Sequence, residues 1–266
     1  MTGRELREAL KSGRRVYGTS IVSASPAWPP VVRRAGLDFV FIDAEHTPRD
    51  PEVLSWMCRA YGALGLPPIV RIPSPDPHLA SHALDGGASG IIAPYIESAE
   101  QVRRLVGATK RRPLKGARLA MAFSNPKTLE AELQDYLDER NAGVVLIVNI
   151  ESVPAMRNLN RIVAVPGLDA VLIGPHDLSC SLGIPEQYRD ARFDEAVCEI
   201  ICKARAADIG AGVHFSDGID LEIHWAKDAG ASLIVHSSDV RLFAEALQRE
   251  IARIRESVGD DTPPGD

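Results

Sequence analysis

The chain has 266 residues, of which 45% are hydrophobic and 25% are charged, as is ordinary for a soluble globular protein. A chain of this length can bury a large core without disulfides or structural metals. Its net charge of −6 argues against nucleic acid as a partner, and its apolar runs are too short to cross a membrane. The charged segment 1–15 lacks the apolar core of a signal peptide, so we expect a cytoplasmic protein.

Short apolar runs alternate with longer helical patterns along the chain. Most of the short runs are continuously apolar, as expected for parallel strands that are buried on both faces. Eight such runs are predicted to be strands: Val16–Val22, Phe39–Ile42, Pro68–Ile72, Gly90–Pro94, Val144–Ile150, Ala170–Ile173, Gly210–His214 and Ser232–His236.

Helical patterns fill the intervals, among them Pro51–Tyr61, Ala99–Ala108, Thr128–Arg140 and Phe193–Ala207. Eight strand–helix units in a chain of this length predict a (β/α)8 TIM barrel, because strand–helix alternation builds a parallel sheet. An open doubly wound sheet is the alternative, but no GxGxxG follows the first strand. No linker divides the chain, so we predict one domain over residues 1–258.

Two segments do not fit the strand–helix pattern. Lys110–Lys127 is rich in basic residues, proline and glycine, and it is predicted to be an irregular loop that could cover the site. The tail, residues 259–266, reads GDDTPPGD and is predicted to be disordered.

Polar residues follow most of the predicted strands, at the end of a barrel where active sites are found. They converge from six strands: Asp43 to His46, Arg71, Asn149 to Glu151, Gly174 to Asp177, His214, and His236 to Asp239. A barrel selected only for stability does not need several carboxylates, histidines and an arginine at one rim. The sequence therefore predicts an active site there.

Glu151 and Asp177 follow neighbouring strands, so their carboxylates can point at one position above the barrel. Two carboxylates, with substrate oxygens and water, suit a hard divalent ion. The alternative is that each carboxylate caps the helix that follows it, or that Asp177 enters a short helix.

Arg71 and His46 are further candidates at the rim. A guanidinium at Arg71 can hold a carboxylate or a keto oxygen, or it can form a structural ion pair with Asp43 or Glu45. His46 can act as a general base near neutral pH, or it can satisfy a backbone group. Asp85 lies inside a predicted helix and by itself indicates nothing.

Lysines and cysteines argue against two other kinds of chemistry. An aldolase that forms a Schiff base needs a desolvated lysine on a barrel strand. None of the six lysines falls in a predicted strand: Lys11, Lys110, Lys115, Lys127, Lys203 and Lys227. The four cysteines form no CxxC pair. Cys198 and Cys202 are four residues apart on a predicted helix; they are interpreted as buried or half-buried thiols, with a metal pair as the alternative.

The run Phe39–His46, FVFIDAEH, resembles a signature of the HpcH/HpaI aldolase/citrate lyase family, and within it the metal-dependent class II pyruvate aldolases. Those enzymes act on 4-hydroxy-2-oxoheptanedioate and 2-dehydro-3-deoxy sugar acids. Four further matches follow in order: PIVR at 68–71, LDGGA at 84–88, IVNIES at 147–152 and VPGLDAVLIGPHDLS at 165–179. The resemblance covers roughly residues 3–250.

The resemblance implies a role for each matching residue. Glu151 and Asp177 would hold Mg²⁺, Mn²⁺ or Co²⁺, and Arg71, next to Asp43, would hold the 2-oxo oxygen of pyruvate or oxaloacetate. Gly174, Pro175 and the backbone amides of His176 and Asp177 would bind the substrate carboxylate. His46, paired with Asp85, would move the proton.

The resemblance also implies a homohexamer, a trimer of dimers that exchange the C-terminal helix, Val240–Ile254, and an aldehyde as the second substrate. Four positions depart from the family pattern: Asn149, Lys115 to Arg118, His176, and His236 to Ser238. A citrate-synthase-like or citryl-thioester lyase-like enzyme is therefore an alternative, with Lys110–Lys115 as a basic groove for a thioester. A non-catalytic barrel is a third hypothesis.

Overall fold

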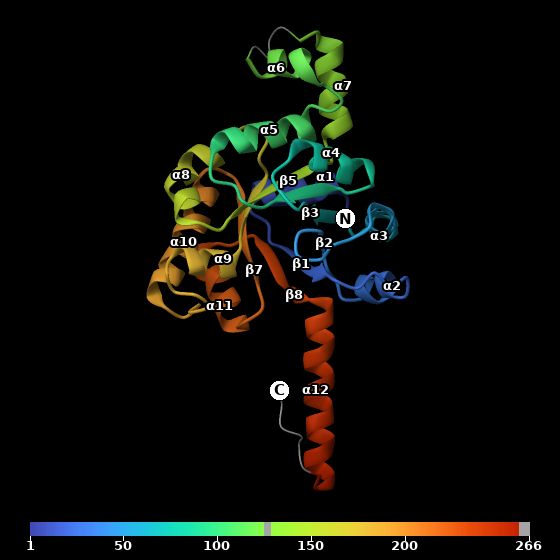
Figure 1. Cartoon of the computed structure of the whole chain (residues 1–266), viewed down its shortest axis with the longest axis vertical. Helices are drawn as coiled ribbons and strands as arrows, with labels where there is room; N and C mark the ends of the chain where they lie inside the picture. Colours follow the sequence, from blue (N-terminus) through green and yellow to red (C-terminus); the bar gives the residue numbers. More distant parts are fainter. Residues whose placement is uncertain (125–128, 261–266) are drawn as a thin grey trace.

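The structure, a computed structural model, describes residues 1–124 and 129–260. Its eight strands form a closed parallel barrel in the order β1 to β8, so the predicted (β/α)8 fold is confirmed (Figure 1). The strands are β1 Val16–Ile21, β2 Val40–Asp43, β3 Pro68–Arg71, β4 Gly90–Ala93, β5 Val145–Ile150, β6 Ala170–Ile173, β7 Gly210–Phe215 and β8 Leu233–Ser238.

Helices cover the outside of the barrel. In chain order they are α1 Gly3–Ser12, α2 Trp28–Arg33, α3 Pro51–Ala63, α4 Pro77–Asp85, α5 Ala99–Lys110, α6 Gly116–Ser124, α7 Ala131–Asn141, α8 Val153–Val163, α9 Pro175–Ser181, α10 Ala191–Ala206, α11 Ile219–His224, the π-helix η2 Trp225–Ala229, and α12 Asp239–Val258. No helix in the described ranges is both long and apolar enough to span a membrane.

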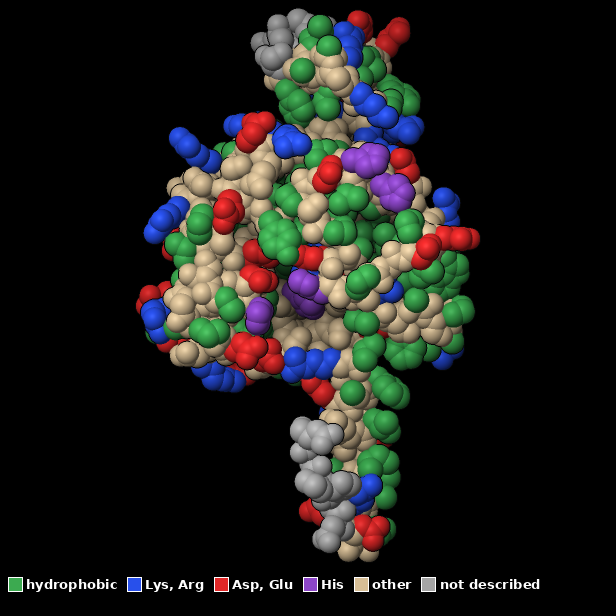
Figure 2. Space-filling view, in the orientation of Figure 1, with side chains coloured by type: hydrophobic (Ala, Val, Ile, Leu, Met, Phe, Trp, Pro, Cys, Tyr) green, Lys and Arg blue, Asp and Glu red, His purple; other side chains and the backbone are tan. Residues whose placement is uncertain are grey.

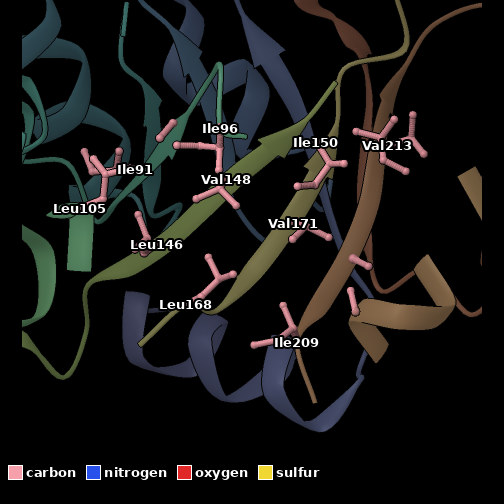
Figure 3. Close-up of a cluster of buried hydrophobic side chains, with 14 of the residues drawn as sticks. Ile91, Ile96, Leu105, Leu146, Val148, Ile150, Leu168, Val171, Ile209 and Val213 are labelled. Carbon is pink, nitrogen blue, oxygen red and sulfur yellow. The ribbon is translucent and has the colours of Figure 1, made fainter. Parts of the chain in front are cut away.

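Most of the core lies between the barrel and its helices. Outward-facing strand residues such as Leu146, Val148 and Val171 pack there with Leu105 of α5 (Figure 3). Because successive strand residues point to opposite faces, the residues between them face the barrel interior. This alternation decides which polar residues reach the site.

The barrel interior is closed at one end by α1. Leu6 and Leu10 of this helix are fully buried and pack with inward-facing residues that include Phe39, Phe41 and Leu172. Gly210 leaves the necessary space, because a Cβ atom there would lie 2.8 Å from a methyl carbon of Leu10. With the amino-terminal end plugged by apolar side chains, polar groups are accommodated at the carboxyl-terminal rim.

The segment predicted as one irregular loop, Lys110–Lys127, is largely ordered. Its first residue ends α5 and Gly116–Ser124 forms α6, so the prediction is wrong for these residues; 125–127 lie outside the described part. Leu119 and Phe123 of α6 lie against Gly107 of α5. The described part of the segment, through α6, therefore packs against α5 on the outside of the barrel.

The two ends of the chain differ in their packing. The amino group of Met1 donates to Gly65 O (2.6 Å), and the capping box of Thr2 and Glu5 starts α1. By contrast, α12 projects away from the barrel (Figure 1), and Asp239 is its one buried residue. Gly259, at φ 81°, ends α12, and 261–266 of the predicted disordered tail lie outside the described residues.

Candidate active site

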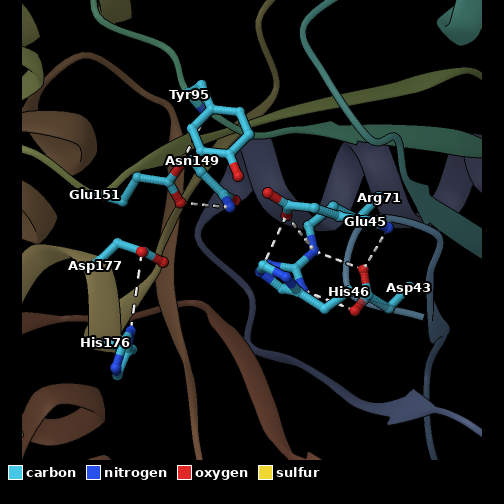
Figure 4. Close-up of polar contacts among 9 residues, drawn as sticks. All are labelled: Asp43, Glu45, His46, Arg71, Tyr95, Asn149, Glu151, His176 and Asp177. Carbon is cyan, nitrogen blue, oxygen red and sulfur yellow. Dashed lines mark hydrogen bonds and ion pairs between the residues drawn. The ribbon is translucent and has the colours of Figure 1, made fainter. Parts of the chain in front are cut away.

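The rim site is built on inward-facing positions at strand ends. Asp43 ends β2, Arg71 ends β3, Asn149 lies near the end of β5, and Glu151 follows that strand. Asp177 comes from the first turn of α9, directly after β6. Figure 4 shows these side chains around one space, and Figure 2 shows acidic and histidine side chains gathered about a hollow near the middle of the same face.

Arg71 is held by two carboxylates. Its Nε and Nη2 donate to the two carboxylate oxygens of Asp43 (2.8 and 2.9 Å), and Nε lies 3.1 Å from Glu45 Oε2. The guanidinium also lies over the Phe41 ring, 5.2 Å from its centroid. The structural ion pair considered as an alternative for Arg71 is therefore present, and it fixes the orientation of the guanidinium at the rim.

Burial and pairing act in opposite directions on this ion pair. Burial disfavours the Asp43 carboxylate, but the hydrogen bonds from Arg71 and their charge attraction lower its pKa overall. Burial likewise opposes the charge of Arg71, yet Asp43, Glu45 and Glu151 raise its pKa overall. Both groups stay charged at neutral pH, so the pair can present an arginine to an anionic ligand.

Glu151 is a buried carboxylate with neutral hydrogen-bond partners. Its Oε1 accepts from the Tyr95 backbone N (2.7 Å) and its Oε2 from Asn149 Nδ2 (3.0 Å). Burial, with the nearby charges of Asp177 and Glu45, raises the pKa of Glu151. Gly174 is needed beside it, because a Cβ atom there would lie 2.8 Å from Glu151 Oε2.

Neither Glu151 nor Asp177 is a helix N-cap, although Asp177 does enter the short helix α9, as the alternative for it allowed. Ser152 is the N-cap of α8, with its hydroxyl accepting from Ala155 N, so Glu151 does not cap this helix. Gly174 is the N-cap of α9, and Asp177 lies in the first turn with a half-exposed side chain. In Figure 4 the Glu151 and Asp177 carboxylates point into the same space.

The first turn of α9 exposes backbone N–H groups to the rim. Leu178 N donates to Gly174 O (3.0 Å), which is the first intrahelical bond. The preceding N–H groups of His176 and Asp177 belong to the open end of the helix, and Pro175 has none to offer. His176 itself is exposed and lies 3.9 Å from Asp177 Oδ1 and 3.8 Å from Glu186 Oε1.

His46 lies at the rim but apart from Asp85. Its ring Nε2 is 3.7 Å from Glu45 Oε2, and its side chain is 62% exposed. Asp85 is the last residue of α4 and forms an ion pair with Arg112. Since α4 starts near the rim and runs away from it, nine residues carry Asp85 about 12 Å toward the other end of the barrel. A single chain therefore does not bring His46 and Asp85 together.

The histidines of β7 and β8, both predicted at the rim, point to opposite faces of the barrel. His214 points inward, its ring edge-to-face with Phe41 at 5.1 Å, and its Nε2 donates to Ser237 O (3.1 Å). Burial lowers the pKa of His214 to about 4, so the ring is neutral at neutral pH. His236 points outward and pairs with Glu222 of α11 (2.8 Å), which corrects the expectation that it joins the rim. The alternation of strand residues explains the difference.

Tyr95 was not predicted at the rim from the sequence, and Glu45, placed there by the strand-end pattern, was given no role beyond a possible ion pair. Tyr95 follows β4 with φ 55°, a backbone conformation that is rare for non-glycine residues and often found at functional sites. The Glu45 carboxylate beside its phenol raises the pKa of Tyr95 to about 12. Glu45 contacts Arg71, His46 and Tyr95. Neither φ nor these contacts can be read from the sequence.

A buried lysine lies at the opposite end of the barrel. Lys110, the last residue of α5, donates to Val144 O and pairs with Asp169, which also binds Arg7 Nε (2.7 Å). Burial lowers the pKa of Lys110 to about 8. Its partners precede β5 and β6, so this network joins helices to the plugged end and takes no part in the rim.

The rim of a (β/α)8 barrel, with converging carboxylates and a fixed arginine, is the arrangement of a barrel enzyme that binds small anionic substrates. The model of the family HpcH/HpaI aldolase/citrate lyase matches residues 18–246. The chain belongs to this family.

Named relatives agree with that class. The chain is 31% identical to a hydroxypyruvate/pyruvate aldolase of Paraburkholderia phytofirmans, over 94% of this chain and 97% of the relative. It is 30% identical to a 2-keto-3-deoxy-L-rhamnonate aldolase of Salmonella gallinarum, over 94% and 92%. A solved citrate synthase, SbnG, matches with a TM-score of 0.80 and 28% identity, over 96% and 99% of the two chains. The prediction of a carbon–carbon lyase is confirmed.

The Asp43–Arg71 pair makes stability depend on pH. We expect Asp43→Asn to lower the free energy of unfolding by about 3 kcal/mol at pH 7, because it leaves a buried guanidinium with one carboxylate fewer. Since the folded-state pKa of Asp43 is lowered, its contribution is present above about pH 4 and is lost as pH falls through the folded pKa. The gap between the two proteins should narrow below about pH 4, as measured by urea unfolding across pH.

Asp138→Asn is the matched control, since Asp138 forms an exposed ion pair with Arg111 at 3.4 Å. It should leave the unfolding free energy almost unchanged. If the Asp43→Asn protein were as stable as the wild type at pH 7, the Asp43–Arg71 ion pair would not contribute to stability, and the prediction would be wrong.

Proposed function

We propose that the protein is a metal-dependent aldolase that makes or breaks a carbon–carbon bond next to the 2-oxo group of pyruvate or a related acid. The observation that carries this proposal is the rim itself. A buried carboxylate, Glu151, and Asp177 point into one space, and a fixed guanidinium, Arg71, comes from the end of β3. These are the groups that can balance the negative charge of an enolate.

A divalent ion fits between Glu151 and Asp177 on electrostatic grounds. Glu151 is buried beside other carboxylates, which raises its pKa, and Arg71 is already paired with Asp43 and Glu45. Carboxylate oxygens are the ligands that Mg²⁺, Mn²⁺ and Co²⁺ accept in such sites. Bound there, the ion would supply positive charge where the substrate's 2-oxo oxygen becomes negative.

The 2-oxo acid has donors on two sides. Arg71 would donate to its 2-oxo oxygen, and the backbone amides of His176 and Asp177, with Gly174 and Pro175 shaping the turn, would bind its carboxylate. Asn149 Oδ1 is buried and has no hydrogen-bond partner among the described residues. A bound substrate or water would supply that partner, which supports a role for Asn149 in substrate binding.

His46 is the group placed to move a proton. In cleavage, the 4-hydroxyl group loses its proton as the C3–C4 bond breaks, an aldehyde leaves, and C3 of the resulting enolate takes up a proton. His46 is exposed at the rim and can serve both transfers through a water. Its pairing with Asp85 would require the Asp85 of a second copy. Within one chain, His46 lies at the rim, near the start of α4, whereas Asp85 lies at the far end of that helix.

The relatives suggest where to look for substrates. Hydroxypyruvate, pyruvate and 2-keto-3-deoxy acids are named in their activities, and oxaloacetate has the same 2-oxo acid group. We propose one of these as donor or product, with an aldehyde as the second substrate.

The citrate-synthase-like alternative is favoured by one observation, the likeness to SbnG. Of the segment expected to form a basic groove for a thioester, Lys110 is buried against Asp169, and Arg112 pairs with Asp85. Arg112 and Lys115 do line a pocket of about 640 Å³ among α4, α5 and α6. Oxaloacetate and a carboxylate or thioester partner, tested beside pyruvate and aldehydes, would separate the two reactions.

Removal of metal should abolish activity. With pyruvate and a panel of aldehydes, read by mass spectrometry, product formation should stop in excess chelator and return with Mg²⁺, Mn²⁺ or Co²⁺. Glu151→Gln should lower kcat/KM at least about 100-fold, because one metal ligand is lost. Glu139→Gln, an exposed carboxylate paired with Arg4, is the control and should be fully active. Full activity in chelator would reject the metal mechanism.

Removal of the His46 imidazole should affect the chemical step. His46→Ala is expected to lower kcat by about 10²–10⁴-fold, the usual contribution of general acid–base catalysis, while metal affinity stays unchanged. His78→Ala, on the exposed side of α4, is the control. An unchanged kcat for His46→Ala would remove this residue from the mechanism.

We also propose that the protein is an oligomer in which α12 is exchanged between copies. One face of α12 carries an apolar stripe of residues that are 42–67% exposed: Val240, Phe243, Leu247, Ile251, Ile254 and Val258. The outer face of β8 and β1, where the eighth helix of a barrel would pack, is left open as a groove of about 370 Å³. Tyr17, Ile219, Ile223 and Ile234 line it. Because α12 projects away from its own barrel, its stripe does not reach its own groove. We therefore propose that the stripe packs into the groove of a second copy.

Charges on the stripe should break this assembly. The wild-type protein should elute as an oligomer, with a hexamer expected from the family resemblance, in light-scattering chromatography. Phe243→Glu with Leu247→Glu should shift it to smaller species, because both substitutions bury charge in the groove. Gln248→Glu lies outside the stripe and is the control. A monomeric wild-type protein would contradict the proposed exchange.

A further inference from the structure

A cluster of metal-ligating side chains lies outside the rim, between α10 and the α11–η2 segment. Asp194 and Cys198 are one turn apart on α10, and His224 ends α11. One ligand atom from each of the three lies within 4.8 Å of the others. The three side chains are partly buried, and none belongs to the site described above.

The distances within the cluster are close to those of tetrahedral coordination. Ligand atoms at about 2.0–2.3 Å from a tetrahedral zinc ion lie about 3.4–3.6 Å apart. His224 Nε2 is 3.4 Å from Asp194 Oδ1, and Cys198 Sγ is 4.0 Å from Asp194 Oδ2. The first distance fits as it stands. The second is to the other carboxylate oxygen of Asp194, so side-chain rotations at Asp194 or Cys198 are needed to bring the three ligand atoms around one ion.

The groups behind the cluster orient it. His224 Nδ1 contacts Asp228 Oδ2 at 2.7 Å, which leaves Nε2 directed at Asp194. The indole N–H of Trp225, which is almost fully buried, donates to Asp194 Oδ1 (2.8 Å). A histidine whose second nitrogen is held by a carboxylate is the usual arrangement around protein zinc sites.

We propose that Asp194, Cys198 and His224 form a second metal site, which takes Zn²⁺. A thiolate, an imidazole and a carboxylate suit zinc and not the magnesium expected from oxygen ligands alone. Binding replaces the Cys198 thiol proton, which is released to solvent, and water completes the tetrahedron. Ile219 and Ile223 of α11 line the groove proposed for α12, so the ion fixes that wall of the groove against α10.

Cobalt reports this site separately from the rim. The full chain, stripped of metal and titrated with Co²⁺, should develop a sulfur-to-cobalt charge-transfer absorption, which oxygen ligands at Glu151 and Asp177 do not give. Cys198→Ser should abolish the band, and Cys180→Ser, at an exposed cysteine of α9, should keep it. Absence of the band in the wild-type protein, or its persistence in Cys198→Ser, would overturn the proposal.

Stability provides a second readout. At Zn²⁺ concentrations about a hundredfold above Kd, the Tm of the wild-type and Cys180→Ser proteins should rise by about 5 °C more than that of Cys198→Ser. The metal-free Tm of Cys198→Ser should match the wild type, which shows that the variant folds. Zn²⁺ affinity in His224→Ala should fall at least about tenfold. Equal zinc responses in all four proteins would contradict a site at this cluster.

Discussion

The closure of the parallel barrel is the constraint on which the rest of the molecule depends. Closure gives every strand an inner and an outer face, and alternate residues take one or the other. At one end, Leu6 and Leu10 of α1 fill the interior. Polar side chains on inner positions are therefore accommodated at the other end. Asp43, Arg71 and Asn149 occupy such positions, and Glu151 follows one of their strands.

The charge balance at this rim explains its proposed chemistry. Asp43, Glu45 and Glu151 lie in a partly buried region with Asp177 beside them, and Arg71 is a guanidinium shared by the first two. Burial, and to a smaller extent the charges of Asp177 and Glu45, raises the pKa of Glu151. A divalent ion and an anionic substrate would enter such a site together, since the ion relieves the repulsion and the substrate satisfies Arg71 and the α9 amides.

The helices outside the barrel leave two apolar surfaces exposed in a single chain. Within the described residues, the apolar stripe of α12 is exposed, and no helix of the same chain covers the groove over β8 and β1. The pairing of His46 with Asp85 that the resemblance implies would also need a second copy, because the two residues lie far apart within one chain. The proposed zinc cluster shares α11 with this groove. The groove and the cluster would therefore both depend on how α11 packs against the barrel.

The sequence by itself determined the barrel and most of the rim. Strand composition and order predicted the fold. Residues at or shortly after strand ends, such as Arg71, Glu151 and Asp177, were identified as candidates because strand ends meet at one edge. The tertiary structure alone decided the rest. A shift of one residue along β8 separates an inward from an outward position, so the orientation of His236 depends on register. Tyr95 at positive φ, the contacts of Glu45, the helix α6 and the approach of His224 to Asp194 and Cys198 depend on packing between segments far apart in sequence, which local patterns do not encode.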